Sequence, residues 1–332
     1  MPRVVLVTGA AGQFGSRLAA ALSNDPNVER VIAVDLRAPE ADLGGADFIR
    51  IDIRSAVLGK VLADAAVDTV VHAGVLSTRA SVGNRSAMKE INVIGSLQLL
   101  AAVQATPSVQ RLVVKSTGSV YGCGPSDPAL FTESDQPDSP PLGGWARDCV
   151  EVEGYVAAFA RRRPDVGIAT LRFAHAIGPT VQTGMTHYFR LPVIPIVLGR
   201  DPRLQFLHED DLLSALHRAA IADFTGTYNI AGAGAITLLQ AAGLIGRPVL
   251  PVPAPLFGPV LGVLHQAGVD FSGQEVEYLA YGRMLDTSAA ERSWGFIPKY
   301  STRAAFDAYV HGAVEVAGAT LDSTAAREAD HG

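Results

Sequence analysis

The sequence contains little cysteine and little clustered positive charge. Its 332 residues include only two cysteines, Cys123 and Cys149, too few for a disulfide framework and typical of a reducing compartment. No lysine or arginine run longer than Arg161–Arg163 occurs and the net charge is −6, so neither nucleic acid nor an anionic membrane is expected as the main partner. The apolar run Val4–Val7 is too short for the apolar region of a signal peptide, and no A-x-A cleavage pattern follows it directly. We therefore predict a cytoplasmic protein.

A long unbroken apolar stretch is also missing. The longest candidate, Pro248–Leu264, is interrupted by prolines at positions 251, 253, 255 and 259, so a membrane span is not expected. With 48% apolar residues, the chain can still bury a large core. These features predict a globular protein.

Short β-rich runs alternate with helical stretches in the first half of the chain. The runs are Val4–Val7, Val31–Val34, Phe48–Ile51, Thr69–His72 and Arg111–Val114. Helices are expected at Ser16–Leu22 and Ala87–Val103, and further strands at Val166–Leu171 and Thr227–Ile230. This alternation predicts an α/β fold, a Rossmann-like doubly wound parallel sheet with right-handed crossovers.

A glycine-rich turn joins the first strand to the first helix. Gly9, Gly12 and Gly15, with Gln13 and Phe14 between the last two, permit a tight turn and a close approach of backbone N–H groups to a pyrophosphate. The following helix N-terminus favours negative charge. In this strand–turn–helix context, the three glycines predict a dinucleotide site.

An acidic residue ends the second strand. Asp35, followed by Leu36, lies twenty residues past Gly15, where such sites hold the ribose hydroxyls of adenosine. Because a carboxylate repels a 2′-phosphate, NAD is favoured over NADP as the cofactor. Arg37 is the residue that works against this preference.

Later motifs complete a family resemblance. They are Asp52-Ile53, Val71-His72-Ala73-Gly74, Asn92, Ser116–Gly122, Arg172–Pro179, Phe206–Asp211, Tyr228–Ile230 and Trp294–Phe296. In order and spacing, the chain resembles the extended short-chain dehydrogenase/reductase superfamily, in its NAD-dependent epimerase/dehydratase branch, over nearly its whole length. The resemblance implies that Asp52 and Ile53 contact adenine, that His72, Ala73 and Gly74 line the cofactor, that Asn92 braces the central helix, and that Thr117 holds the catalytic Ser/Thr position, beside the cofactor.

The resemblance also divides the chain. Residues 1–178 are expected to form the NAD-binding Rossmann domain, including strand six, and residues 179–317 a smaller C-terminal substrate lobe interleaved with the last sheet strand near 227–231. Residues 318–332 are expected to be a flexible tail. His208, Asp210 and Asp211 are interpreted as a helix start, and no metal site is predicted.

The catalytic motif of the family is absent. None of the four lysines, Lys60, Lys89, Lys115 and Lys299, follows a tyrosine by four residues. In relatives, tyrosinate moves the substrate proton and lysine lowers the pKa of that tyrosine. The aligned positions here are Trp145 and Cys149, and an indole N–H cannot shuttle a proton at neutral pH.

Two classes of function are therefore open. One is an epimerase/dehydratase-like oxidoreductase that transfers hydride at a hydroxyl or carbonyl and takes its acid/base from His175, Tyr121, Cys149 or Tyr155. The other is an inactive NAD-binding sensor, scaffold or assembly protein. Fold alone does not decide between them.

The substrate class is also open. No lysine or arginine lies between Arg247 and Arg283, and the apolar run inside this interval is proline-rich, which makes a core helix unexpected there. Leu256, Phe257 and Leu261 are therefore expected to line either an apolar ligand cleft above the nicotinamide or an interface with another protein, such as a homodimer face, and the alternative is an ordinary lid packed on the sheet. Nucleotide sugars are the alternative, with arginines outside this interval binding the diphosphate.

Overall fold

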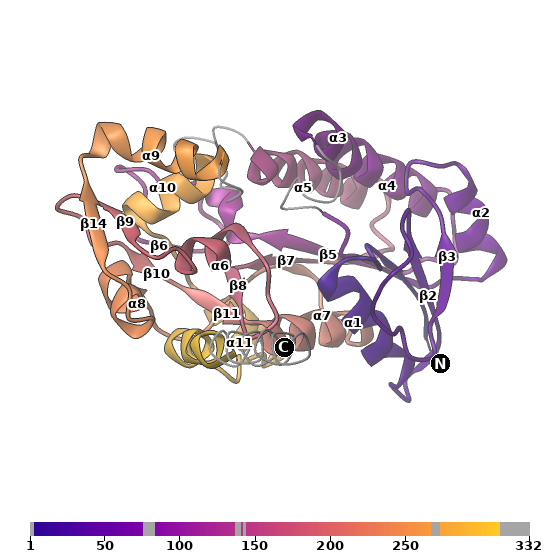
Figure 1. Ribbon diagram of the computed structural model, residues 1–332. Helices are drawn as coiled ribbons and strands as arrows, with labels where there is room; N and C mark the ends of the chain where they lie inside the picture. Colours follow the sequence, from indigo (N-terminus) through magenta and orange to yellow (C-terminus); the bar gives the residue numbers. More distant parts are fainter. Residues whose placement is uncertain (1–2, 76–83, 137–140, 142–143, 267–272, 313–332) are drawn as a thin grey trace, which may run out of the picture.

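A seven-stranded parallel sheet forms the centre of the protein (Figure 1). The structure is a computed structural model that describes residues 3–75, 84–136, 141, 144–266 and 273–312. In spatial order the strands are β12 (Gly226–Ile230), β7 (Gly167–Phe173), β5 (Arg111–Thr117), β4 (Thr69–His72), β1 (Arg3–Thr8), β2 (Val28–Asp35) and β3 (Asp47–Arg50). Each of the seven predicted strands is present, so the predicted α/β parallel sheet is confirmed.

Helices cover both faces of the sheet, because its central strands are apolar on both sides. Every residue of β4 is buried, as are the last four of β1. One face packs against α1 (Gln13–Ser23), α7 (Glu209–Ile221) and α11 (Ser288–Trp294), and the other against α2 (Val57–Asp64), α4 (Ser96–Gln104) and α5 (Gly144–Arg162). The carboxyl ends of the parallel strands are thereby brought to one edge, where ligands of such sheets bind.

The helix expected over Ala87–Val103 is not continuous. It begins as α3 (Arg85–Lys89), passes through a π-helical turn, η1 (Glu90–Gly95), and continues as α4. The Ser96 hydroxyl donates to the carbonyl of Asn92, four residues earlier, a bond that bends helices. Gly95 also lies against Ile53, since a Cβ there would come within 2.6 Å of the Ile53 Cδ1. The predicted helical stretch is therefore present, with a π-helical turn inside it that the sequence pattern did not indicate.

A second lobe is built from elements later in the chain. It contains β8 (His175–Ile177), α6 (Gly184–Phe189), β9 (Ile194–Val197), β10 (Arg203–Leu204), β11 (Phe206–His208), β13 (Ile236–Thr237), α8 (Leu238–Leu244), β14 (Val249–Val252), α9 (Ala254–Gln266), α10 (Gly273–Tyr281) and a helix over residues 302–312. A separate apolar cluster holds this lobe together. The strand β6 (Leu130–Phe131) pairs with β15 (Met284–Leu285) across the chain. The expected tail, 318–332, lies outside the described residues.

The proline-rich run forms a helix after all. Helix α9 contains Pro255 in its first turn, where the backbone N–H would be unpaired in any helix, so that only Pro259 interrupts its interior. Phe257 and Leu261 are 2% and 1% exposed and pack in the second lobe's own core, whereas Leu256 is 55% exposed. The prediction that prolines prevent a core helix here is wrong. Across the described ranges, no helix is long and apolar enough to cross a membrane.

Candidate cofactor-binding and active site

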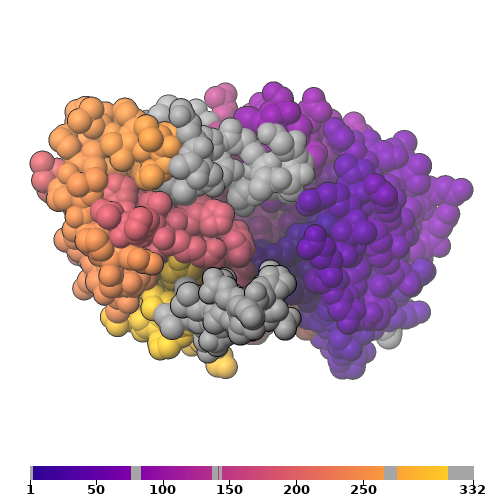
Figure 2. Space-filling model, in the orientation of Figure 1, coloured from indigo at the N-terminus to yellow at the C-terminus, as the bar shows by residue number. Residues whose placement is uncertain are grey.

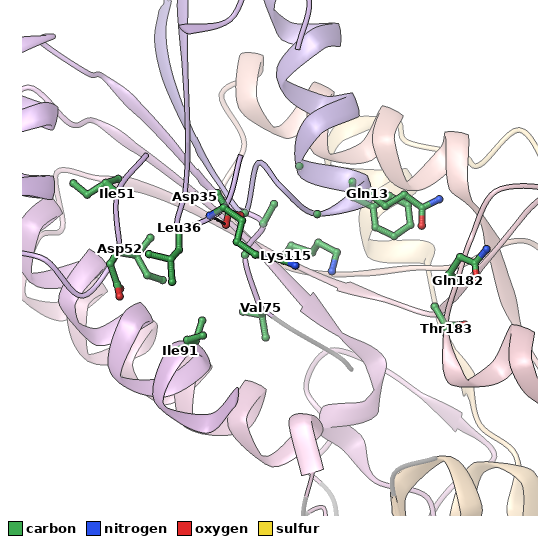
Figure 3. Close-up of a pocket in the computed structure, with 18 residues that line it drawn as sticks. Gln13, Asp35, Leu36, Ile51, Asp52, Val75, Ile91, Lys115, Gln182 and Thr183 are labelled. Carbon is green, nitrogen blue, oxygen red and sulfur yellow. Dashed lines mark hydrogen bonds between the residues drawn. The ribbon is translucent and has the colours of Figure 1, made fainter. Parts of the chain in front are cut away.

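A cavity of about 320 Å³ lies at the carboxyl edge of the sheet. The predicted residues that line it are Gly9, Gly12, Gln13, Phe14, Gly15, Asp35, Leu36, Asp52, Ile53, Ala73 and Gly74, and the lining residues that sequence reasoning missed are Arg37, Ile51, Val75, Ile91, Lys115, Gln182 and Thr183. Figure 2 shows the surface hollowed between the indigo N-terminal part and the red segment of the second lobe. Gln182 and Thr183 thus bring the second lobe to a cavity made mostly by the Rossmann strands (Figure 3).

The glycines of the first turn allow close backbone packing. Gly9 has φ +77°, and a Cβ on it would lie 2.5 Å from the Gly74 Cα. A Cβ on Gly15 would lie 2.0 Å from the Gly9 carbonyl oxygen. Helix α1 starts without a side-chain cap and without an acidic residue in its first turn, so its first N–H groups are available to an anion.

Two acidic residues lie toward one end of the cavity (Figure 3). The Asp35 carboxylate accepts the backbone N–H of Ala11 at 3.0 Å with one oxygen and that of Arg37 at 3.1 Å with the other. Asp52 is bound by the Arg54 side chain, and these hydrogen bonds lower the Asp52 pKa. Asp35 keeps acceptor sites free for a ligand, whereas Asp52 is largely engaged.

Three predicted cofactor residues are not among those that line the cavity. His72 is buried between the hydroxyls of Thr8 and Ser96, at 2.8 and 2.7 Å, and burial lowers its pKa to about 4. Asn92 is on the π-helical turn. Thr117 ends β5, and its hydroxyl oxygen accepts the backbone N–H of Ser119. His72 is therefore a neutral, hydrogen-bonded side chain inside the protein near neutral pH, and it does not line the cavity as the resemblance implied.

A buried charged network underlies the start of helix α5. Arg85 on α3 donates to both carboxylate oxygens of Asp148, at 2.8 and 2.6 Å, and to the carbonyl of Gly144. The Asn92 amide donates to Asp148 at 3.0 Å. Asp148 is completely buried, so the loss of one partner would leave its charge uncompensated. This network fixes the helix that carries Trp145 and Cys149.

The acid/base candidates on the second-lobe side are engaged or neutral. The Tyr121 hydroxyl donates to Asn229 and accepts from Arg172, and burial raises its pKa. Burial, helped by the charge of Arg283, lowers the pKa of His175 to about 3, and its ring lies 4.4 Å from that of Tyr278. Neither side chain is a proton carrier near neutral pH.

The candidates on α5 are no better placed. Burial raises the pKa of the Cys149 thiol, although the charge of Lys115 opposes this. Trp145 is partly buried against the cluster on the α1 face, while Tyr155 packs against the cluster on the opposite face. Cys149 is therefore a neutral thiol. His208, interpreted as part of a helix start, caps α7 by accepting the backbone N–H of Asp210.

Sequence comparison places the chain in a family. The profile of the NAD dependent epimerase/dehydratase family matches residues 5–231. The chain belongs to this family. Its cofactor is NAD, and its function is of the NAD-dependent oxidoreductase type. A Mycobacterium tuberculosis protein described as uncharacterized is 45% identical over 318 residues, 94% of this chain and 84% of that protein.

Solved structures of the extended short-chain dehydrogenase/reductase type share the fold. MoeE5 in complex with UDP-glucuronic acid and NAD superposes with a TM-score of 0.71 at 25% identity, covering 95% of this chain and 99% of MoeE5. UDP-glucose 4-epimerase from Thermotoga maritima gives a TM-score of 0.72 at 22% identity, covering 94% of this chain and 99% of that enzyme. The resemblance to this superfamily is thereby confirmed.

Proposed function

We propose that this epimerase/dehydratase family member transfers hydride between NAD and a hydroxyl- or carbonyl-bearing carbon of a nucleotide sugar. The observation that carries the proposal is the cavity, which extends from Asp35 past the glycine turn to Lys115 and to Thr183 of the second lobe. A cofactor seated there would have one end at the strand β2 acid and the other between the two lobes. Bound NAD supplies the hydride acceptor and donor.

The chain's own residues fit this cofactor. The first N–H groups of α1 are not bonded by a side-chain cap and so are available to a bound anion such as a diphosphate. The free acceptor sites of Asp35 suit two ribose hydroxyls. Leu36, Ile53 and Ile91 give apolar walls to the adenine end. These contacts support the predicted binding roles of the glycine turn and Asp35.

An anionic substrate is supported by a buried guanidinium beyond Thr117. Arg283 is 5% exposed and donates to the carbonyl of Gly122 at 2.8 Å and to the hydroxyl of Ser119 at 3.1 Å. Burial raises the pKa of Cys123 and lowers that of His175, and the charge of Arg283 opposes the first shift and adds to the second. A guanidinium with neutral partners suits phosphate oxygens.

Two of the three residues expected to line an apolar ligand cleft are buried in the protein's own core. Phe257 and Leu261 are used by the chain's own core, which leaves only Leu256 of the three exposed. The structural similarity to MoeE5, solved with UDP-glucuronic acid and with UDP-glucose, supports nucleotide sugars instead. We therefore favour a nucleoside diphosphate sugar as substrate.

Turnover with defined substrates tests the proposal. Protein saturated with NAD⁺ is mixed with UDP-glucose, UDP-glucuronic acid or a long-chain alcohol, and nicotinamide reduction and sugar products are followed by absorbance and chromatography. We expect change with a nucleotide sugar only. Tight NAD⁺ binding without any conversion would favour the sensor or scaffold function, and turnover of the alcohol alone would contradict the substrate class.

A further inference from the structure

Lys115 differs from the other three lysines in its surroundings. Lys60, Lys89 and Lys299 are exposed, whereas Lys115 projects from β5 into the cavity. Its Nζ lies 5.8 Å from the centre of the Phe14 ring, between the ends of the cavity marked by Asp35 and by Gln13 (Figure 3).

Within the part of the chain that the structure describes, the Lys115 side chain makes no ion pair and no hydrogen bond, and its amine lies over the Phe14 ring. Burial lowers its pKa, and the main opposing influence is the thiol of Cys149. Lys115 is partly buried at the edge of the cavity, and a partly desolvated amine gains its partners from a ligand, because a charge withdrawn from water without a partner is costly.

The amine occupies the neighbourhood from which the family's lysine is missing. Cys149 stands on α5 at the position where the resemblance expects lysine, and the charge of Lys115 acts on the Cys149 pKa. Because side chains alternate along a strand, Lys115 and Thr117 point to the same side of β5. The amine of this site is thus supplied by Lys115 on β5 rather than by a lysine on α5.

We propose that Lys115 is a catalytic residue whose neutral amine accepts the substrate's hydroxyl proton and whose ammonium returns it. This inference rests on the proposed function. In the oxidative direction, the C–H bond delivers a hydride to NAD⁺, the O–H bond delivers its proton to the Lys115 amine, and a carbonyl forms. The products are the carbonyl compound, NADH and the Lys115 ammonium, so atoms and charge balance. Buried lysines serve as bases in this way, because desolvation favours the neutral amine.

Other ionisable groups around Lys115 are held in fixed states. His72 on β4 is neutral above about pH 4, and Cys149 on α5 is a thiol. The carboxylates of α5 that act on Cys149 are bound by arginines, Asp148 by Arg85 and Glu153 by Arg172. Across the cavity lie Asp35, Arg37 and Asp52. A titration between neutral and alkaline pH is therefore assigned to Lys115.

Cofactor binding tests this proposal without a substrate. The Kd values of NAD⁺ and NADH are measured by calorimetry from about pH 6 to about pH 9 for wild type, Lys115→Met, Lys115→Arg and the exposed control Lys60→Met. The oxidised nicotinamide is a cation and the reduced ring is neutral, so only NAD⁺ is repelled by an ammonium. We expect wild type and Lys60→Met to gain about tenfold or more in NAD⁺ affinity, relative to NADH, as pH rises. Lys115→Met and Lys115→Arg should lose this dependence.

Turnover rates of Lys115 variants distinguish a residue that accepts a proton from one that only supplies a positive charge. Lys115→Arg keeps the charge but lacks a neutral amine, so turnover should fall by about 10²–10⁴-fold while NADH affinity stays near wild type. Adding Cys149→Lys to Lys115→Met should restore part of the rate. A pH-independent NAD⁺/NADH ratio in wild type, or full turnover in Lys115→Arg, would overturn the proposal and leave the proposed function standing. Failure of wild type to bind either nucleotide would instead overturn the proposed function.

Discussion

The Asp35 carboxylate should set both the affinity and the selectivity of cofactor binding. A carboxylate has about four acceptor sites, of which backbone N–H groups of Ala11 and Arg37 use two. The two left match two ribose hydroxyls, and each hydrogen bond to a charged group contributes about 1.5–3 kcal/mol. Asp35→Asn keeps one acceptor oxygen and loses the charge, so we expect NAD⁺ affinity to fall by about 10- to 100-fold, the equivalent of roughly one such bond.

Selectivity separates this effect from a folding defect. Removing the carboxylate also removes its repulsion of a 2′-phosphate, and Arg37 lines the same cavity, so NADP⁺ affinity should hold or rise. Calorimetry with both nucleotides is compared with Asp47→Asn, whose exposed carboxylate on β3 pairs with Arg30 and should leave binding unchanged. Unchanged NAD⁺ affinity in Asp35→Asn, or an equal loss for NAD⁺ and NADP⁺, would refute the reasoning.

Three further predictions concern the turn, a buried histidine and helix α9. Gly15→Ala puts a Cβ 2.0 Å from the Gly9 carbonyl oxygen and should lower both Tm and NAD⁺ affinity. In the control Gly154→Ala, on α5, the Cβ meets nothing within 4 Å, so Tm should rise or stay unchanged. Melting curves and calorimetry of the two variants test this difference. His72 has a pKa of about 4 in the folded protein and about 6.5 in the unfolded chain. Its contribution to the free energy of unfolding is therefore complete above about pH 6.5 and decreases as the pH is lowered, by about 2 kcal/mol at about pH 5. Urea unfolding should show a smaller pH dependence for His72→Gln, and equal slopes would contradict this. Phe257→Asp should unfold the second lobe, whereas Leu256→Asp should melt like wild type; a folded Phe257→Asp protein would show that this side chain is not core.

Local patterns were enough to predict the sheet and the glycine turn. Val5–Val7 and all of β4 are buried on both faces of the sheet, and Gly9 follows β1 directly. The π-helical turn could not be predicted, because it depends on Ser96 bonding to the carbonyl of Asn92 and on contact with a different segment. Helix α9 was missed because its prolines were counted without regard to their places in a helical turn.

The active-site end of the cavity depends on long-range contacts. Gln182 and Thr183 reach the cavity from a segment distant in sequence, and no local pattern marks them. Lys115 did carry a signal, since it lies two residues before Thr117 and therefore on the same side of the strand. The Tyr-x-x-x-Lys pattern does not include this position, because in that pattern the amine comes from the helix.

A crystal structure of the NAD complex would test the central claim most directly. The account predicts adenosine ribose hydroxyls within about 3 Å of the Asp35 carboxylate, and the nicotinamide end beside Lys115 with no protein carboxylate bound to its amine. NAD bound elsewhere, or a Lys115 amine turned away from the cavity to pair with a carboxylate, would contradict it.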